Sequence, residues 1–115
     1  MNQPAEESKA LEKLRQGEWS GLEVLVRLHQ AKALRVAFLI TQDVPLAEDV
    51  VADTFLYLVT HLDHFDQNRP FEPYLLRSVA NAALKAAQAR KGHLSLDGNP
   101  EIVEEIFEQG RAVES

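Results

Sequence analysis

"SGLEVLVRLHQAKALRVAFLI", residues 20–40, decides the fold of this chain, because its apolar residues recur at spacings of three and four. That spacing places them on one side of a helix, whereas a strand would alternate apolar and polar residues. The stripe, which other apolar residues of the stretch widen, consists of Leu22, Leu25, Val26, His29, Ala33, Val36, Ala37 and Ile40. Ser20 and Glu23 have the spacing of a capping box, in which each side chain accepts from the other's backbone amide. We therefore predict a long, mostly buried helix capped by this pair.

Helical patterns continue on both sides of this stretch. "SKALEKLRQG", residues 8–17, predicts a short first helix. "TQDVP", residues 41–45, interrupts the pattern, and Pro45 suits the first turn of the next helix. That helix is expected to run from Leu46 to about His64. Its apolar stripe consists of Ala47, Val51, Phe55, Leu58, Leu62 and Phe65.

A last long helix follows a polar turn at residues 66–69 and is opened by Pro70. Its apolar side consists of Phe71, Tyr74, Leu75, Val79 and Leu84. We predict an all-α fold, a compact bundle of three main helices plus a short N-terminal helix. One helical domain is expected over residues 1–92, and residues 93–115 are expected to form an acidic linker or a short C-terminal helix.

Composition limits what the chain can be. Its 115 residues include no cysteine, which excludes disulfides, thiolate metal sites and a cysteine nucleophile. Neither a signal peptide nor an apolar run of about 20 residues, the length of a membrane span, is present. We therefore expect a cytoplasmic protein without a membrane span.

Charge is unevenly distributed along the chain, whose net charge is -6. Residues 1–66 hold six Lys or Arg against eleven Asp or Glu, and residues 97–115 hold one against six. Residues 67–96 hold five against one. A basic segment in an acidic chain predicts a local contact with an anion or a nucleic acid, and the alternative is a solvated helix face.

Catalytic and metal-binding patterns are weak. His61 and His64 lie one helical turn apart with Asp49 and Asp53 upstream, but no further ligand converges on them, which favours surface histidines over a metal site. His29 lies within an apolar stripe and is predicted to be a hydrogen-bonded core histidine. Because there is neither a glycine-rich phosphate loop nor a nucleophile motif, the sequence predicts no enzyme and no cofactor.

A candidate binding face lies on the helix that follows Pro45. Asp49 and Asp53 are four residues apart, and Leu56 and Tyr57 follow one turn later. A small apolar group beside carboxylates suits a basic, helical partner, and the alternative is again a solvated face.

Four pieces of the chain, in this order and spacing, resemble region two of sigma-70-type RNA polymerase sigma factors, most closely the extracytoplasmic-function (ECF) group. They cover about residues 11–92 and read "LEKLRQGEW", "AEDVVADTFLYLV", "LDHFDQNRPFEPYLLRSVANAAL" and "ARKG". The resemblance implies that the helix containing "AEDVVADTF" binds the clamp helices of the polymerase β′ subunit. It implies that the following turn and helix hold the melted promoter -10 element. It also admits an anti-sigma factor as a partner.

Capturing a melted strand requires cations for phosphates, amides for base edges and rings for stacking. The predicted cations are Arg69, Arg77, Lys85, Arg90 and Lys91. The amides are Gln67, Asn68 and Asn81, and the rings are Phe71 and Tyr74, of which Phe71 is favoured as a core residue.

Several positions depart from the family pattern. Tyr74 and Val59 stand where the resemblance leads one to expect tryptophan, and Ala52 and Tyr57 where glutamine and arginine are usual. In the DNA helix, the positions that are often arginine are Ala80, Ala82, Gln88 and Ala89. Fewer phosphate contacts predict weak promoter binding by this domain alone.

Two other functions stay open at this point. The first is a sigma-like interaction or regulatory module that has lost DNA readout. The second is a self-associating helical domain in which exposed Leu56, Tyr57 and Val59 form a dimer seam.

Overall fold

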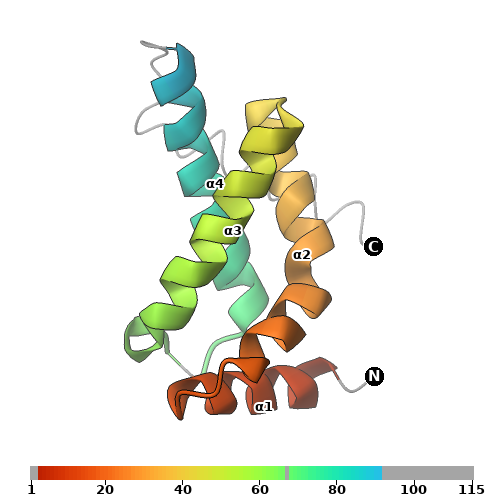
Figure 1. The fold of residues 1–115 in the computed structure, drawn as a ribbon, viewed down its shortest axis with the longest axis vertical. Helices are drawn as coiled ribbons and strands as arrows, with labels where there is room; N and C mark the ends of the chain where they lie inside the picture. The colour runs from red at the N-terminus through yellow and green to blue at the C-terminus, as the bar shows by residue number, and fades with distance from the viewer. Residues whose placement is uncertain (1–2, 67, 92–115) are drawn as a thin grey trace.

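Three long helices lie side by side and a shorter one crosses the end of the bundle at which α2 and α4 begin (Figure 1). The computed structural model describes residues 3–66 and 68–91. Its helices are α1 (Gln3–Arg15), α2 (Ser20–Thr41), α3 (Val44–Thr60), the short 3₁₀ helix η1 (Leu62–His64) and α4 (Phe71–Lys91). No strand occurs within these ranges. The predicted all-α bundle of three main helices and a short N-terminal helix is confirmed.

α1 begins at Gln3, five residues before the predicted start at Ser8. Pro4 does not prevent this, because the amide that proline lacks has no helical partner in a first turn. Glu6 places a negative charge in the first turn, where it interacts favourably with the positive end of the helix dipole. Gly17, with φ of +86°, follows the helix as predicted, and the Glu18 amide closes the turn onto the carbonyl of Lys13 at 2.8 Å.

The predicted capping box at the start of α2 is wrong. The N-cap residue is Trp19, and no side chain caps the helix. The first amides already have backbone acceptors, since Gly21 donates to the carbonyl of Glu18 at 3.3 Å and Leu22 to that of Trp19 at 3.0 Å. Ser20 therefore lies inside the helix, where its hydroxyl has no free amide to accept from.

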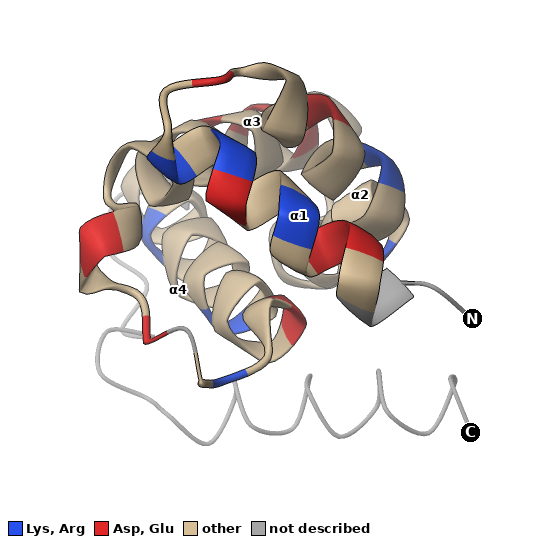
Figure 2. Cartoon of the chain, turned by 90° about the horizontal axis from the view of Figure 1, so that it is seen from below, with Lys and Arg blue, Asp and Glu red and all other residues tan. Residues whose placement is uncertain are grey.

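α1 and α2 touch at Gly21. A Cβ atom built on Gly21 would lie 2.3 Å from the carbonyl oxygen of Ala10 and 2.9 Å from Cγ of Leu14. Only a residue without a side chain permits this approach. Figure 2 shows α1 lying across the ends of the other helices, with charged residues along it.

α3 starts as the sequence predicts. Asp43 is its N-cap, with Oδ1 accepting from the Leu46 amide at 3.0 Å, and Pro45 lies in the first turn. The helix ends at Thr60, before the predicted end near His64, and η1 continues the chain. All six residues of the predicted stripe are buried.

The core fills the space between α2, α3 and α4. Its largest fully buried side chains are Phe71, Leu25, Leu58, Leu75 and Val79. Phe38 and Leu39, which widen the stripe of α2 in the sequence, remain exposed at the far end of the helix. None of the described helices has the length and apolar character needed to cross a bilayer.

Candidate functional site

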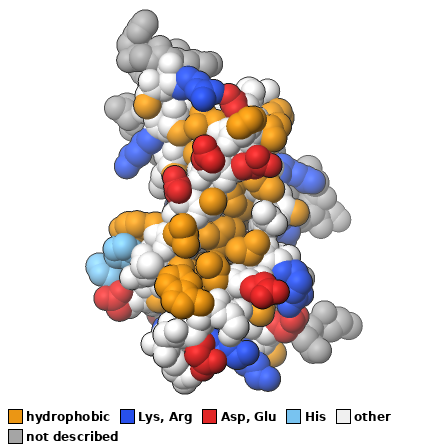
Figure 3. All heavy atoms as spheres, viewed as in Figure 1, with side chains coloured by type: hydrophobic (Ala, Val, Ile, Leu, Met, Phe, Trp, Pro, Cys, Tyr) orange, Lys and Arg blue, Asp and Glu red, His pale blue; other side chains and the backbone are white. Residues whose placement is uncertain are grey.

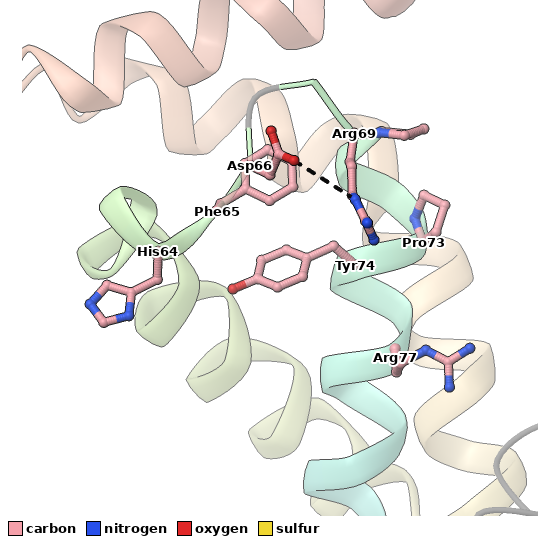
Figure 4. Close-up of a pocket in the computed structure, with 8 residues that line it drawn as sticks. His64, Phe65, Asp66, Arg69, Pro73, Tyr74 and Arg77 are labelled. Carbon is pink, nitrogen blue, oxygen red and sulfur yellow. Dashed lines mark ion pairs between the residues drawn. The ribbon is translucent and has the colours of Figure 1, made fainter.

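A pocket of about 600 Å³ opens beside the turn that leads from η1 into α4. Its walls are the turn and the first two turns of α4, as Figure 4 shows. The lining residues are His64, Phe65, Asp66, Arg69, Pro70, Pro73, Tyr74 and Arg77. The pocket thus brings together three of the predicted DNA-binding residues, Arg69, Tyr74 and Arg77.

Two aromatic rings form the apolar part of this pocket. The rings of Phe65 and Tyr74 lie 4.9 Å apart, and Figure 4 shows the ring of Tyr74 reaching from α4 toward the segment that carries His64 and Phe65. Phe71 is fully buried behind them, 5.6 Å from Phe65. The prediction that Phe71 packs in the core is therefore confirmed, whereas Tyr74 is partly exposed in the pocket.

Asp66 organises the turn at the mouth of the pocket. Its Oδ1 accepts from the Asn68 amide at 2.9 Å, its carbonyl accepts from the Arg69 amide at 3.1 Å, and its Oδ2 lies 3.8 Å from Nε of Arg69. This is the local bonding by which aspartate stabilises turns. Asn68 and Arg69 are both exposed, whereas the predicted site residue Gln67 lies outside the described residues.

A second pocket, of about 480 Å³, lies between α3 and α4. Its lining residues are Asp53, Thr54, Tyr57, Leu58, Tyr74, Ser78, Asn81, Ala82 and Lys85. Because Tyr74 lines both pockets, they adjoin. The second one joins Asp53 and Tyr57, predicted to bind polymerase, to Asn81 and Lys85, predicted to bind DNA.

Ser78, which was not predicted from the sequence as a site residue, lines this second pocket. Its hydroxyl donates to the carbonyl of Tyr74 at 2.9 Å, one turn earlier on α4. The signal was present, because Tyr74, Ser78, Asn81 and Lys85 are spaced four, three and four residues apart and so share one face of a helix.

The C-terminal end of α4 is less available to DNA than the sequence suggested. Arg90 forms an ion pair with Oδ2 of Asp43, the N-cap of α3. The side chain of Lys91 lies outside the described residues. Ala80, where the family pattern often has arginine, is fully buried in the bundle, so at this position alanine serves packing.

The outer face of α3 carries the predicted acidic group. Glu48, Asp49 and Asp53 are exposed, and Leu56 and Tyr57 are 50% and 60% exposed. Figure 3 shows acidic side chains beside an apolar patch on the side of the molecule that α3 crosses. We define the α3 face as Asp49, Asp53, Leu56 and Tyr57.

Val59 does not belong to an exposed seam, so this part of the self-association hypothesis is wrong. It is only 8% exposed. Val59 is one of the buried residues of the core cluster, and it also lines a cavity together with Leu14 and Arg15 of α1.

His29 is the hydrogen-bonded core histidine that the sequence predicts. It is 6% exposed, and its ring lies between two carboxylates. Nε2 is 2.7 Å from Oε1 of Glu7 in α1, and Nδ1 is 2.9 Å from Oε2 of Glu72 in α4. Lys32, one turn along α2, donates to Oε1 of Glu72 at 3.0 Å. This cluster joins three helices.

Replacing Glu72 by glutamine is expected to remove part of the acid sensitivity of folding. Burial acts to raise the pKa of Glu72, but hydrogen bonds from Lys32 and His29 and the charges of both outweigh it, so the pKa lies below the ordinary value of 4.5. A lowered pKa stabilises the fold above the unfolded value, and that stability is lost as the pH falls through the folded value. As the pH falls from about 7 to about 3, the free energy of unfolding measured with urea should decrease more for the unsubstituted chain than for Glu72→Gln. Glu23→Gln, on the exposed side of α2, is the control, and an unchanged pH profile for Glu72→Gln would contradict the prediction.

The two histidines near the end of α3 form no metal site with their neighbours. The Nδ1–H of His61 donates to the carbonyl of Tyr57 at 2.7 Å, and the His61 ring stacks on that of Tyr57 at 4.0 Å. Within the described ranges, no three His, Cys, Asp or Glu residues converge in a way that would hold a metal ion.

Comparison with known proteins identifies the family of this chain. The family model for sigma-70 region 2 matches residues 25–92, more than half of the chain. No curated protein and no solved structure matches the chain. The matched residues include α2 from Leu25 onward, all of α3, both pockets and α4. The chain belongs to the sigma-70 region 2 family.

Proposed function

We propose that this chain is a sigma-factor region 2 domain that binds core RNA polymerase through the α3 face and takes part in recognising and melting the promoter -10 element. The observation that carries the proposal is the α3 face itself, an exposed pair of carboxylates followed by two exposed apolar side chains. Interfaces combine apolar anchors with complementary charge. A basic helical partner, such as the clamp helices of β′, meets both requirements.

The nucleic-acid part of the proposal rests on the two pockets. The first has a size and an aromatic wall that suit one extruded base, with Arg69 and Arg77 lining it. The second continues along α4 with Asn81 for a base edge and Lys85 for a phosphate. The remaining predicted contacts, from Gln67, Asn68, Arg90 and Lys91, stay part of this proposal.

The resemblance of the sequence supports the finer parts of the proposal. They are membership of the ECF group, the β′ clamp helices as the target, an anti-sigma factor as an inhibitor, and action in the cytoplasm.

The alternative of an interaction module that has lost DNA readout is favoured by one observation. Arg90 already pairs with an internal carboxylate, and Ala82 and Ala89 supply no charge on α4. This alternative predicts the same polymerase binding with no binding of single-stranded DNA. The oligonucleotide titration described in the next subsection separates the two.

Reversing the charge of Asp49 is expected to weaken binding to a β′ clamp-helix fragment by about tenfold, because a carboxylate that faces basic residues becomes a repelling cation. Asp49 is exposed in mid-helix, so the far-ultraviolet circular dichroism of Asp49→Arg should match that of the unsubstituted chain. The measurement is a calorimetric or fluorescence titration of the whole chain.

The matched control is Glu12→Arg, which makes the same charge change on the exposed side of α1. Equal losses in both variants would indicate a general effect of net charge. Full binding by Asp49→Arg would remove the α3 face from the proposal.

A further inference from the structure

One buried side chain links the N-terminal helix to the first pocket. His29 contacts Glu7 of α1 through one ring nitrogen and Glu72 of α4 through the other. Glu72 lies between Phe71 and Pro73, and Pro73 lines the pocket. All of α1 lies outside the residues that the family model matches. Only the Glu7 end of the link therefore lies outside the matched region, whereas His29 and Glu72 lie inside it.

Aromatic packing carries the link from His29 to the pocket wall. The His29 ring lies 5.7 Å from that of Phe71. Phe71 in turn meets Phe65 at 5.6 Å and Tyr74 at 6.3 Å, and these two rings form the apolar wall. Because cores are close-packed, a shift of the first turn of α4 is transmitted to both rings.

Both ring nitrogens of His29 are engaged by carboxylates. Each contact is of hydrogen-bond length, so the ring is held from two sides, by α1 and by α4. The charged groups around it are Glu7 from α1, Lys32 from α2 and Glu72 from α4.

We propose that His29 is a positioning residue that couples the docking of α1 to the shape of the base pocket. Held by Glu7, the His29 ring fixes Glu72 and Phe71, and through them the Phe65 and Tyr74 rings. The effect on DNA rests on the proposed function, whereas the effect on the pocket does not. Loss of α1, or of the Glu7 contact, then reshapes the pocket without touching a DNA ligand.

The test compares Glu7→Gln with Glu12→Gln in the whole chain. Both change one carboxylate of α1 to an amide, but Glu12 is exposed and does not contact His29. Three readouts are taken. Fluorescence of Trp19, the single tryptophan, reports the connection between α1 and α2, the ring-proton resonances of Phe65 and Tyr74 report the pocket, and titration with a single-stranded DNA oligonucleotide reports affinity.

We expect Glu7→Gln to shift the Phe65 and Tyr74 resonances and to weaken oligonucleotide binding by about threefold to tenfold. The salt dependence of binding should stay unchanged, because no phosphate contact is removed. Glu12→Gln should leave all of these unchanged.

Altered Trp19 fluorescence with unmoved Phe65 and Tyr74 resonances would overturn the coupling, as would equal effects of the two variants. If the unsubstituted chain binds no oligonucleotide, the nucleic-acid part of the proposed function fails. The ring resonances then decide the coupling without it.

Discussion

Replacing Phe71 by alanine is expected to lower the free energy of unfolding by about 3–5 kcal/mol, the cost usual for removing a buried phenylalanine. Phe71 is fully buried at the first position of α4 and lies against His29, Phe65 and Tyr74. The cavity left by the ring cannot be closed by one neighbour alone, because these contacts come from three parts of the chain. Urea unfolding followed by circular dichroism measures the loss.

Phe38→Ala is the matched control for this change. Phe38 is also a helical phenylalanine, but its side chain is exposed on α2. Its removal should cost less than about 1 kcal/mol, as is usual for surface substitutions. Comparable losses in the two variants would contradict the burial of Phe71 in the bundle.

Gly21→Ala is expected to destabilise the packing of α1 on α2, at a cost of about 1–3 kcal/mol. The added methyl group would clash with the Ala10 carbonyl oxygen, because the two atoms would be closer than van der Waals contact allows. Backbone atoms cannot rotate away as a flexible side chain can. α1 should therefore separate from α2 before the rest of the bundle unfolds. Limited proteolysis in α1 and Trp19 fluorescence, compared with global unfolding in urea, measure this order.

Ser20→Ala provides the control at the neighbouring position. Ser20 is exposed and no side chain caps α2, so the substitution should leave stability nearly unchanged. A large decrease in the free energy of unfolding of Ser20→Ala would indicate that Ser20 caps α2. It would contradict the absence of a side-chain cap described above. Unaltered α1 protection in Gly21→Ala would contradict the close contact.

Patterns within one helix were enough to predict the fold. The three-and-four spacing from Leu22 to Ile40 identified α2, and Pro45 and Gly17 marked where helices start and stop. The face of α3 that carries Asp49 and Asp53 was also found from spacing alone. Such signals are local, since helical geometry relates each residue to its neighbours three and four positions away.

Contacts between distant segments explain what the sequence could not show. The partners of His29 lie 22 and 43 positions away, and that of Arg90 lies 47 positions away. Val59 was expected on a surface because its helix has one evident apolar stripe, but it is buried with the core cluster. The pocket shared by α3 and α4 likewise depends on how the two helices pack, which no single stripe encodes.

The ion pair between Asp43 and Arg90 makes an internal carboxylate compete with external phosphate. A DNA strand that binds Arg90 must first displace Asp43, so its apparent affinity falls in proportion to the fraction of time the guanidinium is released. Exposed pairs of this kind are worth up to about 1 kcal/mol, which limits the reduction to about fivefold. After displacement, Asp43 still caps α3 through its other oxygen. If Arg90 contacts DNA as proposed, this pair reversibly masks one cation, and its release leaves the hydrogen bond that caps α3 in place.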